Sequence, residues 1–498
     1  MVLGGVLALL IAQAFGKNAK TDAFFAAYGF YSVGLVFGQT FRLTAVSRLV
    51  RARNPATITR LLGAVAVMSI IAAVPMVALA NPLGRLLVGT DPGGVAATAL
   101  RILWIVLAAQ LLAAMLATIL TVRGAFRVIG VSMLLAGFLS VGTFLLLESP
   151  LGIAAAPVGL AVSAIWLMTV FAAVLLRTGW RPTALTLRSV RAMCSEAGRL
   201  LFGSAIFIGT NVAYVSCIAI AVRQGRGEAT LFAYAYVLAG MLVSVTANVT
   251  AMVRSPAVVA SSDRTNEAAA VGAWGFRFTV VLAGPVLGMT MLVGRPLIAF
   301  ALGSGFSSAN VHEILVTLLC LVGWILGSAA SIFAIVELLA RGELRRLAVL
   351  AAILSAAVPG LALAGGALAG IEGIAAALST AMLGVAAVQL RWAFGDAWRG
   401  EVRTMMRATL RELIVVAVAF APAALLLAVL GESAVTAGVA ALLAAALVAL
   451  ASYVAWPREC QALLRLARRS PQRTAQVAPN DRMHGGPGGE PAKPMRAL

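Results

Sequence analysis

Four polar side chains lie on one face of an otherwise apolar segment near the start of the chain. They are Tyr28, Ser32, Gln39 and Arg42. Their spacing of four, seven and three residues keeps them on one side of a helix. Polar groups inside a membrane helix are costly and normally face a bundle interior or a water-filled cavity, so the stripe predicts one wall of a substrate cavity. Two alternatives stay open: Gly34 and Gly38 form a GxxxG packing pattern, and Arg42 lies near enough to the helix end to reach the membrane interface.

Charged residues precede this segment and recur at a second place in the chain. The stretch FGKNAKTDAFF carries Lys17, Lys20 and Asp22, and the stretch VRQGRGEATLF carries Arg223, Arg226 and Glu228. Two basic hairpins at one mouth of a cavity are placed to meet an anion such as a phosphate. Lys17, Lys20, Asp22, Arg223 and Arg226 are therefore candidate substrate-binding residues. The alternative is a pair of solvated loops.

Four further positions are candidates for binding an ion or the substrate. Asn211 and Tyr214 offer oxygens that coordinate Na⁺ or simply bond neighbouring helices. Glu337 precedes Arg341 by four residues, which predicts an ion pair on one helix face, with proton coupling as the alternative. Arg101, just inside the outer end of its segment, is placed to attract an anion. The expected coupling ion is Na⁺ or H⁺, and we expect no other cofactor.

The composition is that of a membrane protein. The chain is 61% hydrophobic and 11% charged, with a mean hydropathy of +1.00, whereas soluble domains carry about 25% charged residues. Apolar segments of 18 or more residues recur throughout, which predicts an all-α polytopic membrane protein. The net charge of +20 does not indicate nucleic-acid binding, because the basic residues cluster at the ends of apolar segments, as orientation signals do.

Enzyme and metal chemistry find little support in the sequence. The four cysteines show no paired spacing, so neither a metal site nor a disulfide framework is expected. There are two histidines and five aspartates, with no D-x-D pair and no glycine-rich phosphate loop with a lysine. These absences remove the usual acid–base and phosphate-binding groups, so we expect a protein that is not an enzyme.

We expect about fourteen transmembrane spans. Their approximate ranges are 2–15, 23–46, 61–81, 97–122, 125–147, 153–176, 200–222, 229–252, 275–300, 313–340, 346–367, 371–395, 412–430 and 434–456. The first span ends in AQA like a cleavage site, but no basic region precedes it, so we expect a clipped helix and not a signal peptide.

The basic residues predict the orientation of these spans. Connections after the even-numbered spans hold 22 Lys and Arg residues, the opposite side holds six, and the C-terminal tail adds eight to the first side. By the positive-inside rule the first side is cytoplasmic, so we expect both termini in the cytoplasm.

Four short sequence matches predict an internal duplication. TDAFFAAY at Thr21 resembles ATLFAYAY at Ala229, NPLGRLLVG at Asn81 resembles RPLIAFALG at Arg295, RGAFR resembles RGELR, and VGLAVS resembles EGIAAALS. The matches keep the same order at offsets of 207 to 218 residues. Six spans per unit give both halves the same orientation, as in a parallel repeat around a central cavity. The expected division is an N-lobe (1–176), a cytoplasmic linker (177–199), a C-lobe (200–395), two appended helices (412–456) and a disordered basic tail (457–498).

The stretch FGKNAKTDAFFAAY resembles the first outer loop and second helix of the lipid II flippase (MviN/MurJ-type) family of the multidrug/oligosaccharidyl-lipid/polysaccharide exporter superfamily. The matching positions are Gly16, Thr21, Asp22, Ala23, Phe24, Phe25 and Ala27. The fourteen spans, the six-plus-six duplication and the two appended spans agree with that family. The family also places cavity arginines in helices 1, 2 and 8. Here the corresponding positions hold Leu7, Val33 to Val36, and Tyr236 with Val237.

The resemblance implies a multi-pass protein of the bacterial cytoplasmic membrane that transports a lipid-linked glycan by alternating access. This glycan is a lipid II-like or polysaccharide precursor on undecaprenyl pyrophosphate. The implied partners are membrane lipids, this substrate and a cell-wall synthesis complex. Two alternatives stay open: a cation-coupled drug or small-molecule exporter of the same superfamily, and a transport-inactive scaffold in cell-wall assembly.

Overall fold

A computed structural model describes residues 2–51, 55–89, 94–181, 187–248, 250–251, 264–302, 307–430 and 434–456. These residues form helices joined by short turns, with no strand among them. The first half comprises α1 (Val2–Phe15), α2 (Ala19–Arg51), α3 (Pro55–Ala78), α4 (Ala80–Val88), α5 (Val95–Val122), α6 (Phe126–Leu151) and α7 (Ala155–Arg177). The remainder comprises α8 (Leu187–Gln224), α9 (Glu228–Val243), α11 (Arg264–Leu302), α12 (Ser308–Cys320), α13 (Val322–Arg341), α14 (Leu344–Phe394), α15 (Trp398–Leu430) and α16 (Ala434–Ala455).

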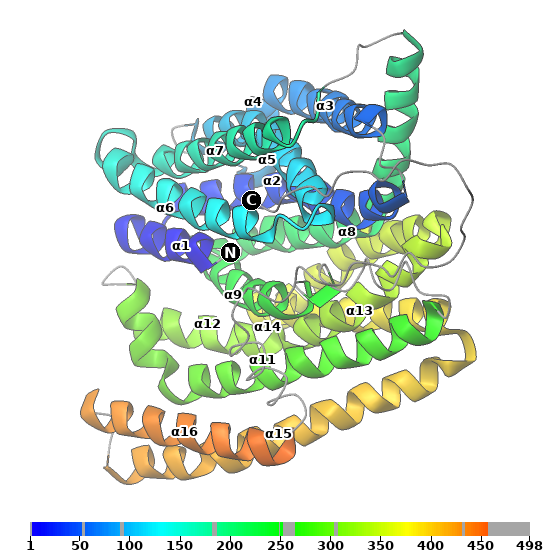
Figure 1. The fold of residues 1–498 in the computed structure, drawn as a ribbon. Coiled ribbons are helices and arrows are strands. Elements are labelled where there is room, and N and C mark those ends of the chain that lie inside the picture. Colours follow the sequence, from blue (N-terminus) through cyan, green and yellow to red (C-terminus); the bar gives the residue numbers. More distant parts are fainter. Residues whose placement is uncertain are drawn as a thin grey trace.

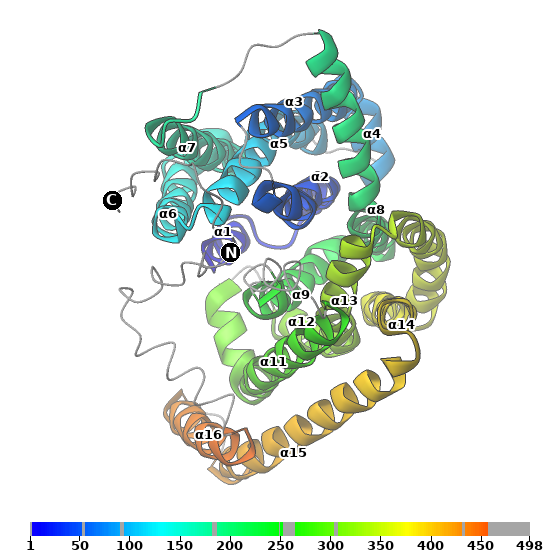
Figure 2. The same ribbon diagram turned by 45° about the vertical axis from the view of Figure 1, so that its right-hand side comes forward.

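The helices gather into two groups. Figure 1 shows α1 to α7 on one side and α9 to α14 on the other, with α8 running between them. Figure 2 shows α15 and α16 along the outside of the second group. One buried apolar cluster joins both groups, whereas α15 and α16 share a smaller cluster around Phe420. The prediction of an all-α architecture is confirmed.

The surface and the helix lengths identify a multi-pass membrane protein. Nine runs within the described residues are long and apolar enough to cross a membrane, and some of these runs contain more than one helix. Leu146, Leu368 and Leu442 are 81%, 88% and 75% exposed. Large leucines exposed to this degree are suited to lipid and not to water. The count of fourteen spans stays a prediction.

Helix α14 is a hairpin. Its 51 residues, drawn straight, would span about 77 Å, far more than a membrane. The helix breaks at Ala369 and Gly370, where Gly370 has a φ of 57° that a residue without a Cβ adopts easily. The two limbs then return so closely that a Cβ on Gly365 would collide with the backbone of Gly373. The predicted spans 346–367 and 371–395 correspond to these two limbs.

The backbone agrees with the predicted duplication at two places. Gly152, between α6 and α7, has φ 57° and ψ −139°, the same angles as Gly370 inside α14. Gly124 and Gly342, each at the end of a helix, both have φ 78°. Both pairs are 218 residues apart in the sequence. Local agreement of this kind is what the repeat requires, and superposition of the two halves stays a prediction.

Glycines bring several helices into close contact. A Cβ on Gly34 would collide with Leu107 of α5, and one on Gly38 would lie 3.2 Å from Ala114 of the same helix. The GxxxG pattern of α2 is therefore a packing face against α5, as small residues in membrane helices typically provide. A Cβ on Gly209 of α8 would lie 2.8 Å from the backbone of Ala351 in α14.

Two helices begin earlier than the apolar pattern predicts. Helix α8 begins at Leu187, inside the predicted linker 177–199, and α15 begins at Trp398, ahead of the predicted span 412–430. Arg, Glu, Met and Leu in these extensions are good helix formers, so the helices continue past the apolar segments that hydropathy detects. The tail 457–498 lies outside the described residues.

Candidate functional site

Asp22 joins the first half of the chain to the second. Its carboxylate accepts hydrogen bonds from the Gly227 amide (2.6 Å), the Thr230 amide (3.0 Å) and the Thr230 hydroxyl (2.6 Å). Gly227 and Thr230 belong to the N-terminus of α9, where amides lack partners within the helix and the helix dipole favours a negative charge. Asp22 therefore caps α9 from α2. The side chain is 4% exposed.

An ion pair completes this junction. The Nζ atom of Lys17 lies 3.0 Å from Oε1 of Glu228, and the two side chains are 17% and 20% exposed. Gly227 has a φ of 83°, and a Cβ there would collide with the Lys17 side chain. We call Lys17, Asp22, Gly227, Glu228 and Thr230 the outer latch, since they lie at the predicted outer end of α2 and α9.

The local sequence positions the latch. Asn18 caps α2 by accepting hydrogen bonds from the Lys20 and Thr21 amides at 2.8 and 3.0 Å. This cap sets Asp22 on the first turn of α2, just before the predicted span that begins at residue 23. Burial raises the pKa of Asp22 above its ordinary value, and the hydrogen bonds from Thr230 and Gly227 and the charge of Lys17 offset only part of that rise.

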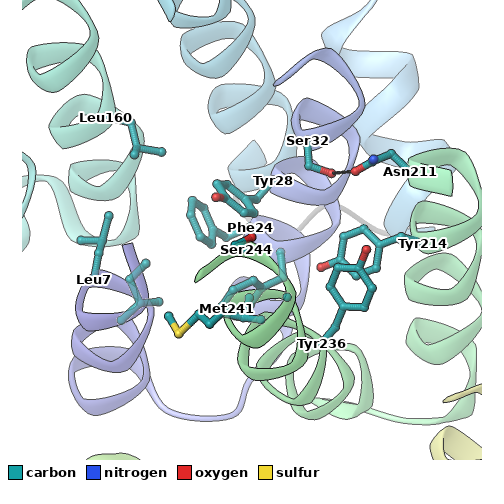
Figure 3. A pocket seen from close by; sticks show the side chains of 14 residues that line it. Leu7, Phe24, Tyr28, Ser32, Leu160, Asn211, Tyr214, Tyr236, Met241 and Ser244 are labelled. Carbon is teal, nitrogen blue, oxygen red and sulfur yellow. Dashed lines mark hydrogen bonds between the residues drawn. The ribbon is translucent and has the colours of Figure 1, made fainter. Parts of the chain in front are cut away.

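A cavity adjoins the latch further along α2 and lies between the two halves of the chain. Its first pocket has a volume of about 300 Å³ and lies between α1, α2 and α7 on one side and α8 and α9 on the other (Figure 3). Its lining residues are Leu7, Ile11, Phe24, Phe25, Tyr28, Ser32, Leu160, Asn211, Tyr214, Tyr236, Val237, Gly240, Met241 and Ser244.

A second pocket of about 260 Å³ adjoins the first and extends toward α13 and α14. The two pockets share Ser32, Asn211, Tyr236, Gly240 and Ser244, and we call them together the interlobe cavity. Ser32 of α2 donates a hydrogen bond to Oδ1 of Asn211 on α8 at 3.0 Å, so this polar contact also joins the two halves. Ser244 and Asn248 belong to a π-helical turn that continues α9, a distortion common at functional sites.

Aromatic rings form much of the cavity wall. Tyr214 and Tyr236 stack with ring centres 3.9 Å apart, and Tyr236 meets Trp324 at 4.7 Å. Nearer the latch, Phe25 of α2 meets Tyr234 of α9 edge to face at 5.1 Å. These contacts connect α2, α8, α9 and α13 around the same space.

Several polar groups in the second pocket have no protein partner. The indole N–H of Trp324 and the hydroxyls of Ser328 and Ser331 are buried and make no hydrogen bond to any described residue. Buried polar groups normally find a partner in protein, water or ligand. No Asp, Glu, Lys, Arg or His is among the described residues that line either pocket. The part of the cavity lined by described residues is therefore largely apolar and aromatic, with a few hydroxyl and amide groups and no charged side chain.

The structure separates the predicted site residues into three groups. Tyr28, Ser32, Asn211 and Tyr214 line the interlobe cavity, and Lys17 and Asp22 belong to the latch. Lys20, Arg223 and Arg226 are exposed near the latch. The side chains of Gln39 and Arg42 lie outside the described residues.

Two predicted residues lie away from the cavity lining. Arg101 is exposed and donates a hydrogen bond to Asn81 of α4 at 2.9 Å. Glu337 is 1% exposed and forms the expected ion pair with Arg341 at 2.7 Å.

Sequence reasoning missed three cavity residues on α13. Trp324, Ser328 and Ser331 are spaced four and three residues apart, which places them on one face of an apolar helix. The same spacing rule identified Tyr28 and Ser32 on α2, so the signal was present. Within the described ranges, no group of three or more His, Cys, Asp or Glu residues is arranged to hold a metal ion.

The chain shares its fold with solved transporter structures. No protein-family model and no curated protein matches the sequence. A structure of the lipid II flippase MurJ in an inward closed conformation aligns with a TM-score of 0.67 and 16% identity, covering 93% of this chain and 97% of that one. An inward-facing multidrug resistance MATE family transporter of the MOP superfamily aligns with a TM-score of 0.59 and 13% identity over 82% and 95%. A MOP superfamily transporter from Pyrococcus furiosus aligns with a TM-score of 0.60 and 14% identity over 81% and 92%. The fold of this chain is that of the MurJ flippase and the MATE transporters.

Proposed function

We propose that this protein flips a lipid-linked glycan across the cytoplasmic membrane by alternating access. Three observations support the proposal: a cavity between two helix groups, a latch that joins the same groups at one end, and a fold shared with a lipid II flippase. The substrate headgroup would enter from the cytoplasmic side and leave outward after the latch opens.

The outer latch is the observation that carries the proposal. A buried carboxylate with three donors on the other half of the molecule is a specific contact that must break before the cavity opens outward. Hydrogen bonds to a charged group contribute about 1.5–3 kcal/mol each. Burial of the carboxylate offsets part of this contribution, so opening costs less than the sum of three such bonds, and substrate binding and a coupling ion would supply that cost.

The charges around the latch suit an anionic substrate. Lys20, Arg223 and Arg226 are exposed, and Glu228 balances Lys17 in the closed latch. Opening the latch would release the Lys17 charge next to the departing phosphate. Exposed charges are screened within about 8 Å at physiological salt, so only a converging set has a useful effect.

The coupling ion in this mechanism is Na⁺ or H⁺. Oxygens of Asn211 and Tyr214 in the cavity are the candidates for Na⁺. Glu337, paired with Arg341 at the predicted inner end of α13, is the candidate for a proton. Membrane lipids and a cell-wall synthesis complex are the proposed partners.

Cross-linking the latch tests the mechanism. Lys17→Cys and Glu228→Cys, joined by a short bismaleimide in reconstituted vesicles, should abolish flipping of a fluorescent undecaprenyl-pyrophosphate glycan. Each single cysteine variant treated with the reagent serves as the control and should flip the glycan faster than the cross-linked protein. Unchanged flipping in the cross-linked protein would contradict alternating access through this end.

A second candidate function is export of drugs or small molecules. The MATE structures share the fold, and no arginine is among the described residues that line the aromatic cavity, where the flippase family places arginines. Export of cationic dyes by vesicles that do not flip the glycan would favour this reading. Absence of both activities in a folded protein would favour the scaffold role.

A further inference from the structure

We propose that the interlobe cavity binds an uncharged group rich in hydroxyls and amides, namely the sugar part of the substrate. On this proposal the phosphate stays outside the part of the cavity lined by the described residues. The inference rests on the proposed function, and it names which part of a lipid-linked glycan the site recognises.

The first argument is the absence of charge from the lining. Among the described residues, both pockets are lined by apolar, aromatic, hydroxyl and amide side chains only. Moving an ion from water into a site without a counter-ion carries a large desolvation cost. The desolvation cost applies to anions and to cations, so it disfavours a phosphate and a cationic drug alike. An uncharged group avoids it.

The second argument is a set of buried polar groups that make no hydrogen bond to the described residues. Trp324 offers an N–H donor, and the hydroxyls of Ser328 and Ser331 both donate and accept. All three line the second pocket, beside the amide of Asn248. These three atoms are buried in this conformation, so a ligand in the pocket reaches them when the side chains of the wall turn toward it, and groups that both donate and accept then satisfy them. Sugar hydroxyls and acetamido groups meet that requirement, because they also donate and accept.

The third argument is the arrangement of the rings. Tyr28 reaches the first pocket from α2, and the stacked Tyr214 and Tyr236 reach it from α8 and α9, with the Ser32–Asn211 hydrogen bond close by (Figure 3). Aromatic faces offer large apolar contact area next to polar edges. A sugar ring has the matching character, since its C–H faces are apolar and its rim carries hydroxyls.

An aromatic cage for a quaternary ammonium ion is the main competing occupant. Such cages attract the cation through the ring faces. In this cavity the described residues supply no carboxylate to balance the charge, while three hydrogen-bonding groups would remain without partners. A sugar would contact the aromatic rings and also form hydrogen bonds with the three polar groups, whereas a cation would contact the rings alone.

Three probes with the same octyl chain test the inference: octyl N,N′-diacetylchitobioside, octyl phosphate and octyltrimethylammonium. Their affinities for the purified full chain in nanodiscs are measured by calorimetry, with empty nanodiscs subtracted. The glycoside is expected to bind at least tenfold more tightly than either charged probe. Tighter binding of octyl phosphate or octyltrimethylammonium would overturn the proposal.

A conservative substitution locates the binding. Trp324→Phe keeps an aromatic ring and removes the N–H donor, so glycoside affinity should fall roughly 3- to 10-fold, as expected for one lost hydrogen bond. Trp392→Phe, a matched change on a half-buried tryptophan outside the cavity, should leave it unchanged. Equal affinity in wild type and Trp324→Phe would place the glycoside elsewhere and refute this site.

Equilibrium binding separates this inference from the proposed transport. Selective glycoside binding without flipping would keep the sugar site and reject the flippase. Flipping of the glycan by a protein that shows no glycoside preference, and that is insensitive to Trp324→Phe, would keep the flippase and reject the sugar site.

Discussion

The outer latch and the interlobe cavity are built on the same helices but treat polar groups in opposite ways. In the latch, the Asp22 carboxylate and the Lys17 ammonium are each matched by a group on the other half of the chain. In the cavity, Trp324, Ser328 and Ser331 leave polar atoms without protein partners. A satisfied network holds the protein in one conformation, whereas an unsatisfied one awaits water or ligand. Groups that are charged in water therefore join the two halves, whereas the described residues that line the interior are uncharged.

The largest effect is expected from removing the Asp22 carboxylate. Asp22→Ala deletes three hydrogen bonds to α9, and a net loss of even 3 kcal/mol changes the ratio of open to closed molecules by about 100-fold. Spin labels at Lys20→Cys and Arg226→Cys, with the native cysteines replaced, report the separation of the two hairpins. The distance distribution should shift to longer values.

Asp396→Ala is the control for this experiment, because Asp396 is an exposed aspartate in the turn before α15. It should leave the distance distribution unchanged. If Asp22→Ala gives the same distribution as wild type, the latch does not hold the two halves together.

A smaller effect is expected from crowding the latch. Gly227→Ala places a methyl group against Lys17 at a φ of 83°. Gly124→Ala also forces a positive φ, 78°, but its Cβ would meet open space. The positive φ alone costs about 1–2 kcal/mol, so any greater loss of thermal stability in Gly227→Ala measures the contact with Lys17. If both variants lose the same thermal stability, the Lys17 side chain moves away from the added methyl group at no cost in stability.

Much of the fold and part of the candidate site could be predicted from the sequence. The parts that could not be predicted have physical reasons. Apolar length predicted the helical membrane fold, and spacing placed Tyr28 and Ser32 at a cavity wall, where the structure has them. Asn211 and Tyr214, predicted from their oxygens to bind an ion, line the same cavity, and ion binding stays a prediction. Spacing along one helix did not show that Asp22 reaches an amide 205 residues away. A contact between distant segments depends on how two hairpins approach each other, which no local pattern contains.

The basic residues illustrate the same limit. Lys17, Lys20, Arg223 and Arg226 were grouped because their loops were expected at one mouth. The structure brings the loops together, and Lys17 then pairs with Glu228 instead of facing outward. Net charge in a loop is readable from sequence, but its neutralisation by a partner loop is not.

The ion pair between Lys17 and Glu228 should stabilise the closed latch less than the hydrogen bonds to the Asp22 carboxylate do. Lys17 and Glu228 are partly exposed, and pairs of this kind contribute about 0.2–1 kcal/mol after screening by solvent. Lys17→Met and Glu228→Gln, combined in a double-mutant cycle on the spin-label distances, should give a coupling of a few-fold that weakens as salt rises. A coupling as large as the Asp22→Ala effect, or one insensitive to salt, would reverse the ranking of the two contacts.

The smallest effect expected is a dependence of the latch on pH. Burial raises the pKa of Asp22 in the closed latch, and exposure to water in an open latch returns it to the ordinary value. Between these two values the closed form binds more protons, so lowering the pH through this window should favour closing, and raising the pH should favour opening. Above the raised value both forms are ionised and the equilibrium should be flat. The spin-label distances of wild type measured across the window between the ordinary and the raised pKa of Asp22 should therefore shorten slightly as pH falls, and Asp22→Asn should remove the trend. A trend of opposite sign would mean that the hydrogen bonds to the ionised carboxylate outweigh its burial.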